Sequence, residues 1–246
     1  MIGVIPARWA SQRFPGKVLV KLLGKPLIQL VWERAKLCPQ LDELFIAYDD
    51  ERIMHAAQKF GAQVIRTKED HPSGTDRIVE AVRNIPADIV INIQADEPLF
   101  PTEAVEALAY TLIKDPSFPV ATVMKRIEIP EELDSPNVVK VVFDHKYRAL
   151  YFSRFAIPFN RDKINFHDIE HYKHIGMYAF RRDFLLKFSE LPESNLERWE
   201  RLEQLRILES GYPIKMIKLT QDSWGVDVPA DLDLIKQKLI LLKEHG

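Results

Sequence analysis

The sequence predicts an α/β fold in which a doubly wound, mostly parallel central sheet carries a smaller mixed or antiparallel extension. Over the first 125 residues, short apolar runs alternate with amphipathic stretches, which is the pattern of βαβ units. Beyond this point apolar runs follow one another without long helices between them. Because no internal repeat, low-complexity tract or flexible linker interrupts the chain, we expect a single domain over residues 1–246 with a strand-rich insertion at about 130–181.

The first half of the chain contains five apolar runs with the length and composition of strands. They are Ile2–Pro6, Glu43–Tyr48, Ala62–Arg66, Asp88–Ile93 and Pro119–Met124. Amphipathic stretches between these strands predict helices. The helices are Pro26–Leu37, Glu51–Phe60, Thr75–Ile85 and Thr102–Ile113. Pro26 stands where a helix start tolerates proline, and Gly61 follows the second helix where a C-terminal cap belongs.

The second half predicts four more strands, one long helix ending at a glycine, and a terminal helix. The strands are Asn137–Asp144, Tyr147–Arg154, His174–Arg181 and Pro213–Leu219, and the helices are Leu196–Gly211 and Pro229–His245. Ligands of open α/β sheets bind beyond the carboxyl ends of the strands. We therefore expect the loop after the first strand, the segment QADEP (Gln94–Pro98) and the segment GVD (Gly225–Asp227) to meet at one edge.

Composition limits the classes of function. The formal net charge is -2, with 34 basic and 36 acidic residues, which argues against a general nucleic-acid or membrane surface. No apolar run reaches the roughly 18 residues of a membrane span, so no membrane insertion is expected. The first strand leaves no room for a signal peptide, and the single cysteine, Cys38, cannot form an internal disulfide. We therefore expect a cytoplasmic protein.

The loop after the first strand carries a concentration of positive charge. From Met1 to Trp32 there are five basic residues and no acidic one. Arg8, Arg13 and Lys17 could bind phosphate oxygens, with a hydroxyl from Ser11 and a tight turn at Gly16. The loop has neither a P-loop nor a dinucleotide-binding glycine pattern, and the lack of the latter argues against a dehydrogenase. A solvated basic surface loop remains the alternative.

Two aspartates complement these cations. Asp96 follows an apolar strand in QADEP, and Asp227 lies in GVD. Mg²⁺ prefers a few carboxylate oxygens together with substrate phosphates and water, so Asp96 and Asp227 are predicted metal ligands in a metal–triphosphate complex. A turn residue is the alternative for Asp96, and a structural role is expected for Glu97.

The segment HPSGTDR (His71–Arg77) precedes a predicted helix. Ser73 or Thr75 could cap this helix, and Asp76 favours its positive end. Gly74 also permits the close backbone approach that suits a flat base, and Arg77 could reach a ligand from the first turn. Structural and ligand-binding roles both remain open here.

Seven stretches, taken together and in this order, resemble the 3-deoxy-manno-octulosonate (Kdo) cytidylyltransferases. They are PARWASQRFPGK, GKPLIQLVWERA, HPSGTDRI, NIQADEPL, HIGMYAFR, ERLEQLRILESG and GVDVPADL. The resemblance runs from residue 2 to about 233 and implies the nucleotide-diphospho-sugar transferase type of sheet. Ala95 departs from the family's glycine, and we expect its methyl group to be tolerated if the backbone there is extended.

The resemblance implies an enzyme that transfers CMP from CTP to Kdo for lipopolysaccharide synthesis, with Mg²⁺ as cofactor and as a homodimer. It assigns nucleotide contacts to Arg8, Ser11, Arg13, Lys17, Ser73, Gly74, Thr75, Arg77 and Gln94. It implies that Asp96 and Asp227 are the metal ligands. It also implies that the catalytic residues are Arg8, Lys17, Asp96 and Asp227. It assigns the sugar to Arg154, His174, Tyr178, Glu203 and Gln204.

These implied sugar contacts agree with the chemistry of the residues. Arg154 could clamp a carboxylate through two parallel bonds, and Glu203 with Gln204 on one helix could bond hydroxyls. On a strand, His174 and Tyr178 point to one face. A satisfied structural histidine and a core tyrosine remain their alternatives.

In the implied reaction the anomeric hydroxyl of Kdo attacks the α-phosphorus of CTP in line and pyrophosphate leaves.

Two other acceptor sugars are alternatives to Kdo. A cytidylyltransferase for a sialic acid has a similar opening motif, although HPSGTDR and the LEQLR helix favour Kdo. An amino analogue of Kdo also remains open as the acceptor. A non-catalytic nucleotide-binding regulator on this fold needs the phosphate contacts but not the two aspartates.

Overall fold

The computed structural model describes residues 1–10 and 14–244. The chain forms two compact units. Unit 1 comprises Met1–Glu106 with Ser223–Gly246, and unit 2 comprises Ala107–Asp222. Helix α4 (Thr102–Lys114) contains the first boundary between them. No helix among the described residues is both long and apolar enough to cross a membrane.

Unit 1 contains a parallel sheet, as the alternating pattern predicts. Its strands are β1 (Ile2–Ala7), β4 (Glu43–Tyr48), β5 (Gln63–Arg66) and β6 (Ile89–Asn92). Their order is β6-β1-β4-β5, and β1 pairs in parallel with both β4 and β6. β1 is almost wholly buried, which explains its continuous apolar sequence.

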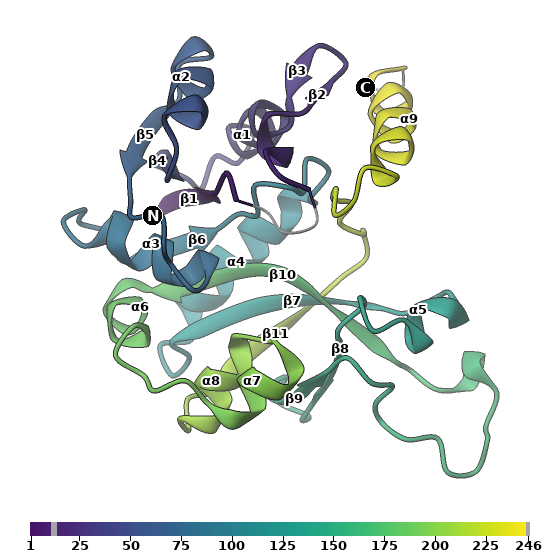
Figure 1. Cartoon of the computed structure of the whole chain (residues 1–246). Helices are drawn as coiled ribbons and strands as arrows, with labels where there is room; N and C mark the ends of the chain where they lie inside the picture. Colours follow the sequence, from purple (N-terminus) through teal and green to yellow (C-terminus); the bar gives the residue numbers. More distant parts are fainter. Residues whose placement is uncertain (11–13, 245–246) are drawn as a thin grey trace. The chain divides into compact units, whose positions relative to one another are not determined.

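The helices of unit 1 cover both faces of its sheet. Helices α1 (Leu27–Ala35) and α2 (Glu51–Lys59) connect strands that progress from β1 to β5, whereas α3 (Gly74–Val82) returns to β6 on the other side of β1. Because such crossovers are right-handed, reversing the direction places α3 on the opposite face (Figure 1). The doubly wound arrangement predicted from the sequence is confirmed.

The capping signals predicted for this unit are confirmed, although α1 and α3 end at Ala35 and Val82, before the predicted Leu37 and Ile85. Pro26 is the N-cap residue of α1. Gly61 follows the end of α2 with a φ of 79°, a left-handed conformation that glycine adopts without strain. Ser73 caps α3 by accepting a hydrogen bond from the backbone N–H of Asp76.

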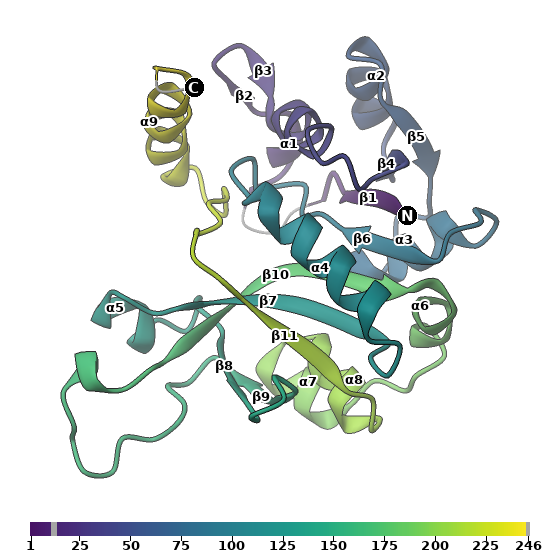
Figure 2. The same cartoon turned by 180° about the vertical axis from the view of Figure 1, so that it is seen from behind.

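The C-terminal segment adds a second core to unit 1. Helix α9 (Asp231–Glu244) stands beside the hairpin of β2 (Lys21–Leu22) and β3 (Lys25–Pro26) in both views (Figures 1 and 2). Ile235 of α9 and Val226 pack with three leucines, Leu22, Leu27 and Leu99. This cluster brings the end of the chain to residues close to its beginning.

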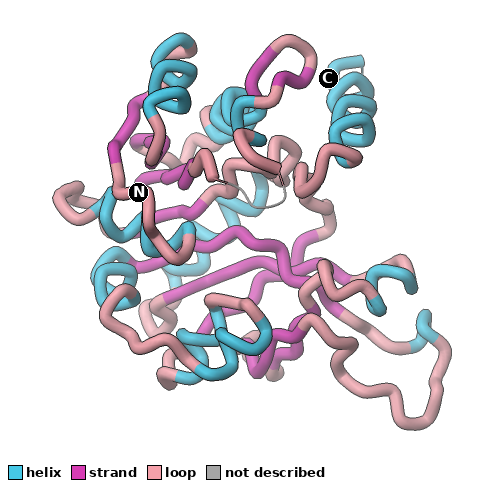
Figure 3. The backbone as a smooth tube through the Cα atoms, viewed as in Figure 1, coloured by secondary structure: helices cyan, strands magenta, loops and turns pink. Residues whose placement is uncertain are grey.

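Unit 2 contains the mixed extension. Its strands are β7 (Val120–Arg126), β8 (Lys140–Phe143), β9 (Ala149–Ser153), β10 (Tyr172–Arg181) and β11 (Ile214–Leu219). β7 pairs in parallel with β11 and antiparallel with β10, and β8 pairs antiparallel with β9 and β10. The connection from β9 to β10 is mostly loop and carries the 3-10 turn η2 (Phe166–Asp168) (Figure 3). Short helices α5 (Pro130–Asp134) and α6 (Arg182–Phe188), which the sequence pattern did not predict, complete this part of unit 2.

The prediction of one continuous helix over Leu196–Gly211 is wrong. The segment forms α7 (Asn195–Glu200) and α8 (Gln204–Glu209), separated by Arg201 with a φ of 55°. The break lets Arg206 of α8 donate two hydrogen bonds, of 2.7 and 2.6 Å, to the Glu197 carboxylate of α7. Helical periodicity does not reveal this turn because the apolar residues on both sides remain in register with one face.

Candidate active site

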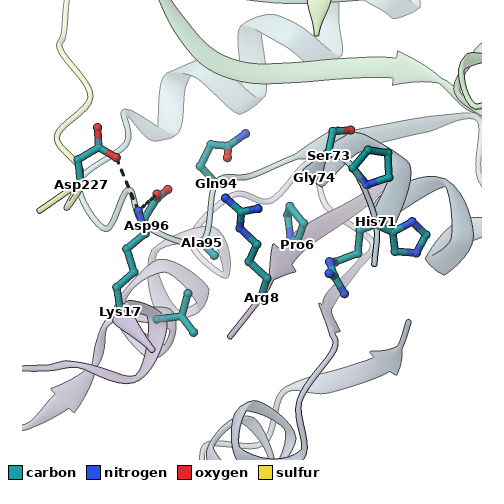
Figure 4. A pocket seen from close by; sticks show the side chains of 13 residues that line it. Pro6, Arg8, Lys17, His71, Ser73, Gly74, Gln94, Ala95, Asp96 and Asp227 are labelled. Carbon is teal, nitrogen blue, oxygen red and sulfur yellow. Dashed lines mark hydrogen bonds and ion pairs between the residues drawn. The ribbon is translucent and has the colours of Figure 1, made fainter. Parts of the chain in front are cut away.

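A pocket of about 320 Å³ lies in unit 1 beyond the carboxyl ends of β1 and β6 (Figure 4). Its lining comes from the opening loop, the start of α3, the QADEP segment and the GVD segment. The lining residues are Pro6, Arg8, Lys17, Val18, His71, Pro72, Ser73, Gly74, Arg77, Gln94, Ala95, Asp96 and Asp227. The predicted meeting of these segments at one edge of the sheet is therefore confirmed.

The two described ends of the opening loop contribute cations to this pocket. Arg8 follows β1 and is exposed, and Lys17 begins the 3-10 turn η1 (Lys17–Leu19). Gly16 has a φ of 70° and donates its N–H to the Trp9 carbonyl at 3.0 Å. A Cβ at Gly16 would lie 2.7 Å from the Trp9 ring, so the tight turn predicted there requires glycine. Ser11 and Arg13 lie outside the described residues.

The Lys17 ammonium lies between the two predicted metal ligands (Figure 4). Its Nζ donates to Asp96 Oδ2 and to the Val226 carbonyl, the latter at 2.9 Å, and lies 3.7 Å from Asp227 Oδ1. The Lys17 side chain is 12% exposed, whereas Asp227 is 54% exposed. The Lys17 ammonium is thus stabilised by two carboxylates, Asp96 and Asp227, that lie far apart in the chain.

Close backbone packing brings these two aspartates together. The Val226 N–H donates to the Asp96 carbonyl at 2.8 Å. A Cβ on Gly225 would lie 3.0 Å from both the Asp96 carbonyl oxygen and Glu97 Cγ, so only glycine allows this approach without a shift. Asp231, at the start of α9, accepts hydrogen bonds from the N–H groups of Asp227 and Val228 and holds the other side of the GVD segment.

Ala95, the departure from the family pattern, lies in a turn and not in extended backbone. The Glu97 N–H contacts the Gln94 carbonyl at 3.4 Å across this turn. The condition under which the methyl group was expected to be tolerated, an extended backbone, is therefore not met. Its methyl group is nevertheless compatible with the turn, because Ala95 does not have a positive φ.

Glu97 has the structural role expected for it. Its carboxyl group accepts a hydrogen bond from the Ser223 hydroxyl and so joins the QADEP segment to the chain two residues before GVD. Burial, followed by the negative charge of Asp96, raises the pKa of Glu97 to about 7.

The start of α3 forms another side of the pocket. Ser73 and Gly74 line it, whereas Thr75 is 1% exposed and lies outside this lining. Arg77 also lines the pocket, but its guanidinium donates to Asp49 Oδ2 at 3.0 Å and to Thr67 Oγ1 at 2.6 Å. Burial lowers the pKa of Arg77, and Arg8 lowers it further, while Asp49 acts in the opposite direction.

Gln94 lines the pocket as predicted, and His71 was missed as a lining residue. The His71 ring contacts the Glu80 carboxylate, which fixes it beside the start of α3. Its place at the head of HPSGTDR was the only indication in the sequence.

The residues predicted for the sugar lie in unit 2, and Arg154 has several backbone partners there. Its guanidinium donates to the carbonyls of Pro136, Glu200 and Arg201 at 2.8, 2.7 and 3.4 Å. These contacts join the segment before β8 to the end of α7. Its role in binding a carboxylate stays a prediction.

His174 and Tyr178 share one face of β10, as predicted. Their ring centroids are 5.3 Å apart, and His174 Nε2 lies 2.8 Å from Thr122 Oγ1. Burial lowers the pKa of His174 to about 3 and raises that of Tyr178 well above its usual value. Glu203 also raises the pKa of Tyr178, which places this carboxylate near the phenol. Gln204, the first residue of α8, is 3% exposed.

Positive charge beside paired carboxylates at the ligand-binding edge of a parallel sheet is an arrangement suited to binding a nucleotide. The family model described as Cytidylyltransferase matches residues 2–218.

Individual relatives narrow this class. A 3-deoxy-manno-octulosonate cytidylyltransferase of Solibacter usitatus is 49% identical, covering 96% of this chain and 93% of the relative. One of Syntrophus aciditrophicus is 46% identical, covering 98% and 97%. The solved structure of a CMP:2-keto-3-deoxy-manno-octonic acid synthetase complexed with CTP is 43% identical, covers 98% of each chain and has a TM-score of 0.91. The chain belongs to the 3-deoxy-manno-octulosonate cytidylyltransferases.

Proposed function

We propose that the protein transfers CMP from CTP to the anomeric 2-hydroxyl of Kdo, giving CMP-Kdo and pyrophosphate. The observation that carries the proposal is the position of Lys17 between Asp96 and Asp227, in a pocket that Arg8 and the start of α3 complete. A non-catalytic regulator would bind phosphates without needing this carboxylate pair. The names of relatives 46–49% identical over almost the whole chain support Kdo as the acceptor.

In the proposed reaction a new bond forms between the anomeric oxygen and the α-phosphorus, and the bond to the β-phosphate oxygen breaks. The hydroxyl proton passes to solvent, and pyrophosphate carries away the displaced electron pair. Arg8 and Lys17 neutralise phosphate charge, and the backbone at Ser73 and Gly74 receives the cytosine. Positioning and charge stabilisation therefore account for most of the rate, and no side-chain nucleophile is needed.

The site also fits Mg²⁺. Asp96 and Asp227 already surround one cationic group, the Lys17 ammonium, and present only oxygen ligands. Among residues 1–10 and 14–244 there is no group of three or more acidic, histidine or cysteine side chains suited to a metal. This matches Mg²⁺, which typically takes one or two carboxylates together with substrate phosphates and water. When bound, the ion would neutralise phosphate charge and polarise the attacked phosphoryl group.

The test is pyrophosphate release from CTP and Mg²⁺ with Kdo, an amino analogue of Kdo, or a sialic acid. We expect turnover with Kdo, and Asp96→Ala should lower kcat by about 10³-fold or more because it removes transition-state charge stabilisation. Asp88→Ala, at the exposed opposite end of β6, is the matched control and should remain active. An active Asp96→Ala enzyme would exclude Asp96 from the mechanism. Turnover with a sialic acid but not with Kdo would show that a sialic acid is the acceptor.

We also propose that the protein works as a cytoplasmic homodimer in lipopolysaccharide synthesis, as the family resemblance implies. Large apolar side chains on unit 2 support an interface: Phe155, Phe159 and Trp199 are 77%, 83% and 73% exposed. Light scattering after size exclusion should give twice the monomer mass, and Phe159→Glu should shift the mass toward the monomer. A monomeric unaltered protein at micromolar concentration would contradict the proposal.

A further inference from the structure

Asp49 lies behind the pocket and connects two of its sides. This residue follows β4 and is 7% exposed. One carboxylate oxygen, Oδ1, accepts the backbone N–H of Trp9 at 2.9 Å. The other, Oδ2, accepts from the guanidinium of Arg77 on α3 at 3.0 Å. A single buried carboxylate therefore joins the opening loop to the helix whose start lines the pocket.

The bond to Trp9 acts directly on Arg8. The peptide group that links these residues includes the N–H that Asp49 accepts. Because a peptide group is planar, fixing its N–H also fixes the direction in which the chain leaves Arg8. Asp49 holds this part of the loop through the backbone, so the bond itself does not neutralise the Arg8 side chain.

The Trp9 residue then connects the two described ends of the loop. Its carbonyl accepts the Gly16 N–H at 3.0 Å, and Gly16 precedes Lys17. Its ring occupies the space that a side chain at position 16 would need. The Arg52 guanidinium covers the ring at 3.5 Å from its centroid. Arg8 and Lys17 are thereby held at a defined spacing through one tryptophan.

The Arg77 side of the connection through Asp49 is also held by several hydrogen bonds. Arg77 is 2% exposed and also donates to Thr67 Oγ1 and to the Lys68 carbonyl at 2.9 Å. Thr67 in turn donates its N–H and its hydroxyl to the Tyr48 carbonyl, at 2.8 and 3.0 Å. Asp49 thus bonds the loop to a part of the sheet and α3 that has its own network of hydrogen bonds.

The buried Asp49–Arg77 pair is poorly explained by stability alone. Desolvation offsets most of the attraction in such pairs, and apolar replacements are often neutral or stabilising. A carboxylate offers a second acceptor oxygen, which an apolar residue lacks and which Trp9 uses. We propose that Asp49, acting through Trp9, is a positioning residue that presets Arg8 and Lys17 for the triphosphate of the nucleotide. This inference rests on the proposed nucleotide function.

The first test measures binding of inorganic triphosphate and of cytidine, each with Mg²⁺, by calorimetry of the full chain. In Asp49→Asn only one acceptor oxygen remains, so the side chain can no longer accept from both Trp9 and Arg77, and the loop loses its connection to α3. We expect the Kd for triphosphate to rise about 10- to 100-fold while the Kd for cytidine changes less than about threefold. A charge-assisted hydrogen bond of 1.5–3 kcal/mol corresponds to a change of this size.

Steady-state kinetics separate positioning from loss of fold. A lower folded fraction reduces the apparent kcat and leaves the KM for CTP unchanged, whereas a misplaced loop raises the KM for CTP. Ile46→Ala is the matched control, because Ile46 is fully buried on β4, three residues before Asp49, and its truncation destabilises the same strand. The control should bind triphosphate like the unaltered protein.

If Asp49→Asn does not fold, Trp9→Leu is the second test variant. It keeps the backbone N–H at position 9 and the Asp49–Arg77 pair. It removes the ring against Gly16, and the Kd for triphosphate should rise about three- to tenfold, the effect of losing about 1 kcal/mol of packing. Unchanged triphosphate binding in folded Asp49→Asn overturns the inference, and unchanged binding in folded Trp9→Leu overturns the claim that Asp49 acts on Lys17 through the Trp9 ring.

The unaltered protein distinguishes this failure from failure of the proposed function. If it binds CTP and triphosphate but does not release pyrophosphate with Kdo, the sugar assignment is wrong and the Asp49 result still stands. If it binds neither CTP nor triphosphate, the nucleotide function and the Asp49 inference are both wrong.

Discussion

The pocket of unit 1, proposed to bind the nucleotide, and the predicted sugar residues of unit 2 differ in what their polar side chains contact. In the pocket, Arg8 is exposed, and the Asp227 side chain is 54% exposed beside the Lys17 ammonium. In unit 2, Arg154 donates to three backbone carbonyls and Gln204 is 3% exposed. Both groups of residues were assigned from the same resemblance of sequence motifs to the family. The difference teaches that substitution of an exposed pocket side chain such as Arg8 should change activity alone, whereas substitution of Arg154 or Gln204 in unit 2 should also change stability.

Replacing one arginine in each region gives the largest contrast. Arg8→Ala should lower kcat/KM for CTP by about 100-fold, because a charge-assisted bond to phosphate is lost, with little change in the free energy of unfolding. Arg154→Ala should lower the free energy of unfolding by about 2–3 kcal/mol, because three carbonyls lose a charged donor. Denaturant unfolding and steady-state kinetics measure the two effects.

Arg161→Ala, at an exposed position in the loop between β9 and β10, is the control for both measurements and should change neither. The contrast between the regions breaks down if Arg8→Ala destabilises the protein as much as Arg154→Ala does.

A glycine substitution sharpens the contrast within unit 1. Gly225→Ala forces the GVD segment away from the Asp96 carbonyl, so we expect kcat to fall about tenfold because the carboxylate pair is displaced. The stability cost should be about 1 kcal/mol.

Gly61→Ala is the matched control. The positive φ of Gly61 makes the loss of stability about the same, but no atom lies within 4 Å of the new methyl group. Turnover at saturating CTP should fall only for Gly225→Ala. Equal activity of the two variants would show that the GVD approach does not position the aspartates.

The smallest effect concerns His174 and pH. Burial lowers the pKa of His174 to about 3, so the unfolded chain binds a proton below pH 6.5 that the folded chain does not. The unfolded state therefore gains stability as the pH falls from 6.5 toward 3, and by pH 5.5 the folded state loses about 1.3 kcal/mol relative to pH 7.

His174→Gln should remove this contribution and flatten the pH dependence of unfolding between pH 7 and 5, as measured by denaturant titration at each pH. An unchanged slope would mean that His174 is not held neutral by burial, which would make its environment more like that of the pocket.

How far the sequence predicted these features depended on the range of the interactions involved. The strands and caps of unit 1 follow from local pattern: Glu43–Tyr48 forms the strand as predicted, and Ser73 caps α3. The break at Arg201 was not predicted, because it depends on an ion pair between Glu197 and Arg206 that is formed only after both helices pack. His71 was not identified as a pocket residue, since only its place at the head of HPSGTDR distinguishes it from an ordinary loop histidine.

The sequence by itself determined the alternation of the main strands and helices of unit 1, the edge at which the loops collect, and the chemical type of the site, because periodicity, turn residues and charge act over a few residues. Only the tertiary structure decided which groups meet: Gly225 bringing Asp227 to Asp96, Lys17 between them, and Asp49 joining Trp9 to Arg77. These contacts link residues far apart in the chain, and their geometry depends on how the sheet and helices pack. No local pattern in the sequence carries that information.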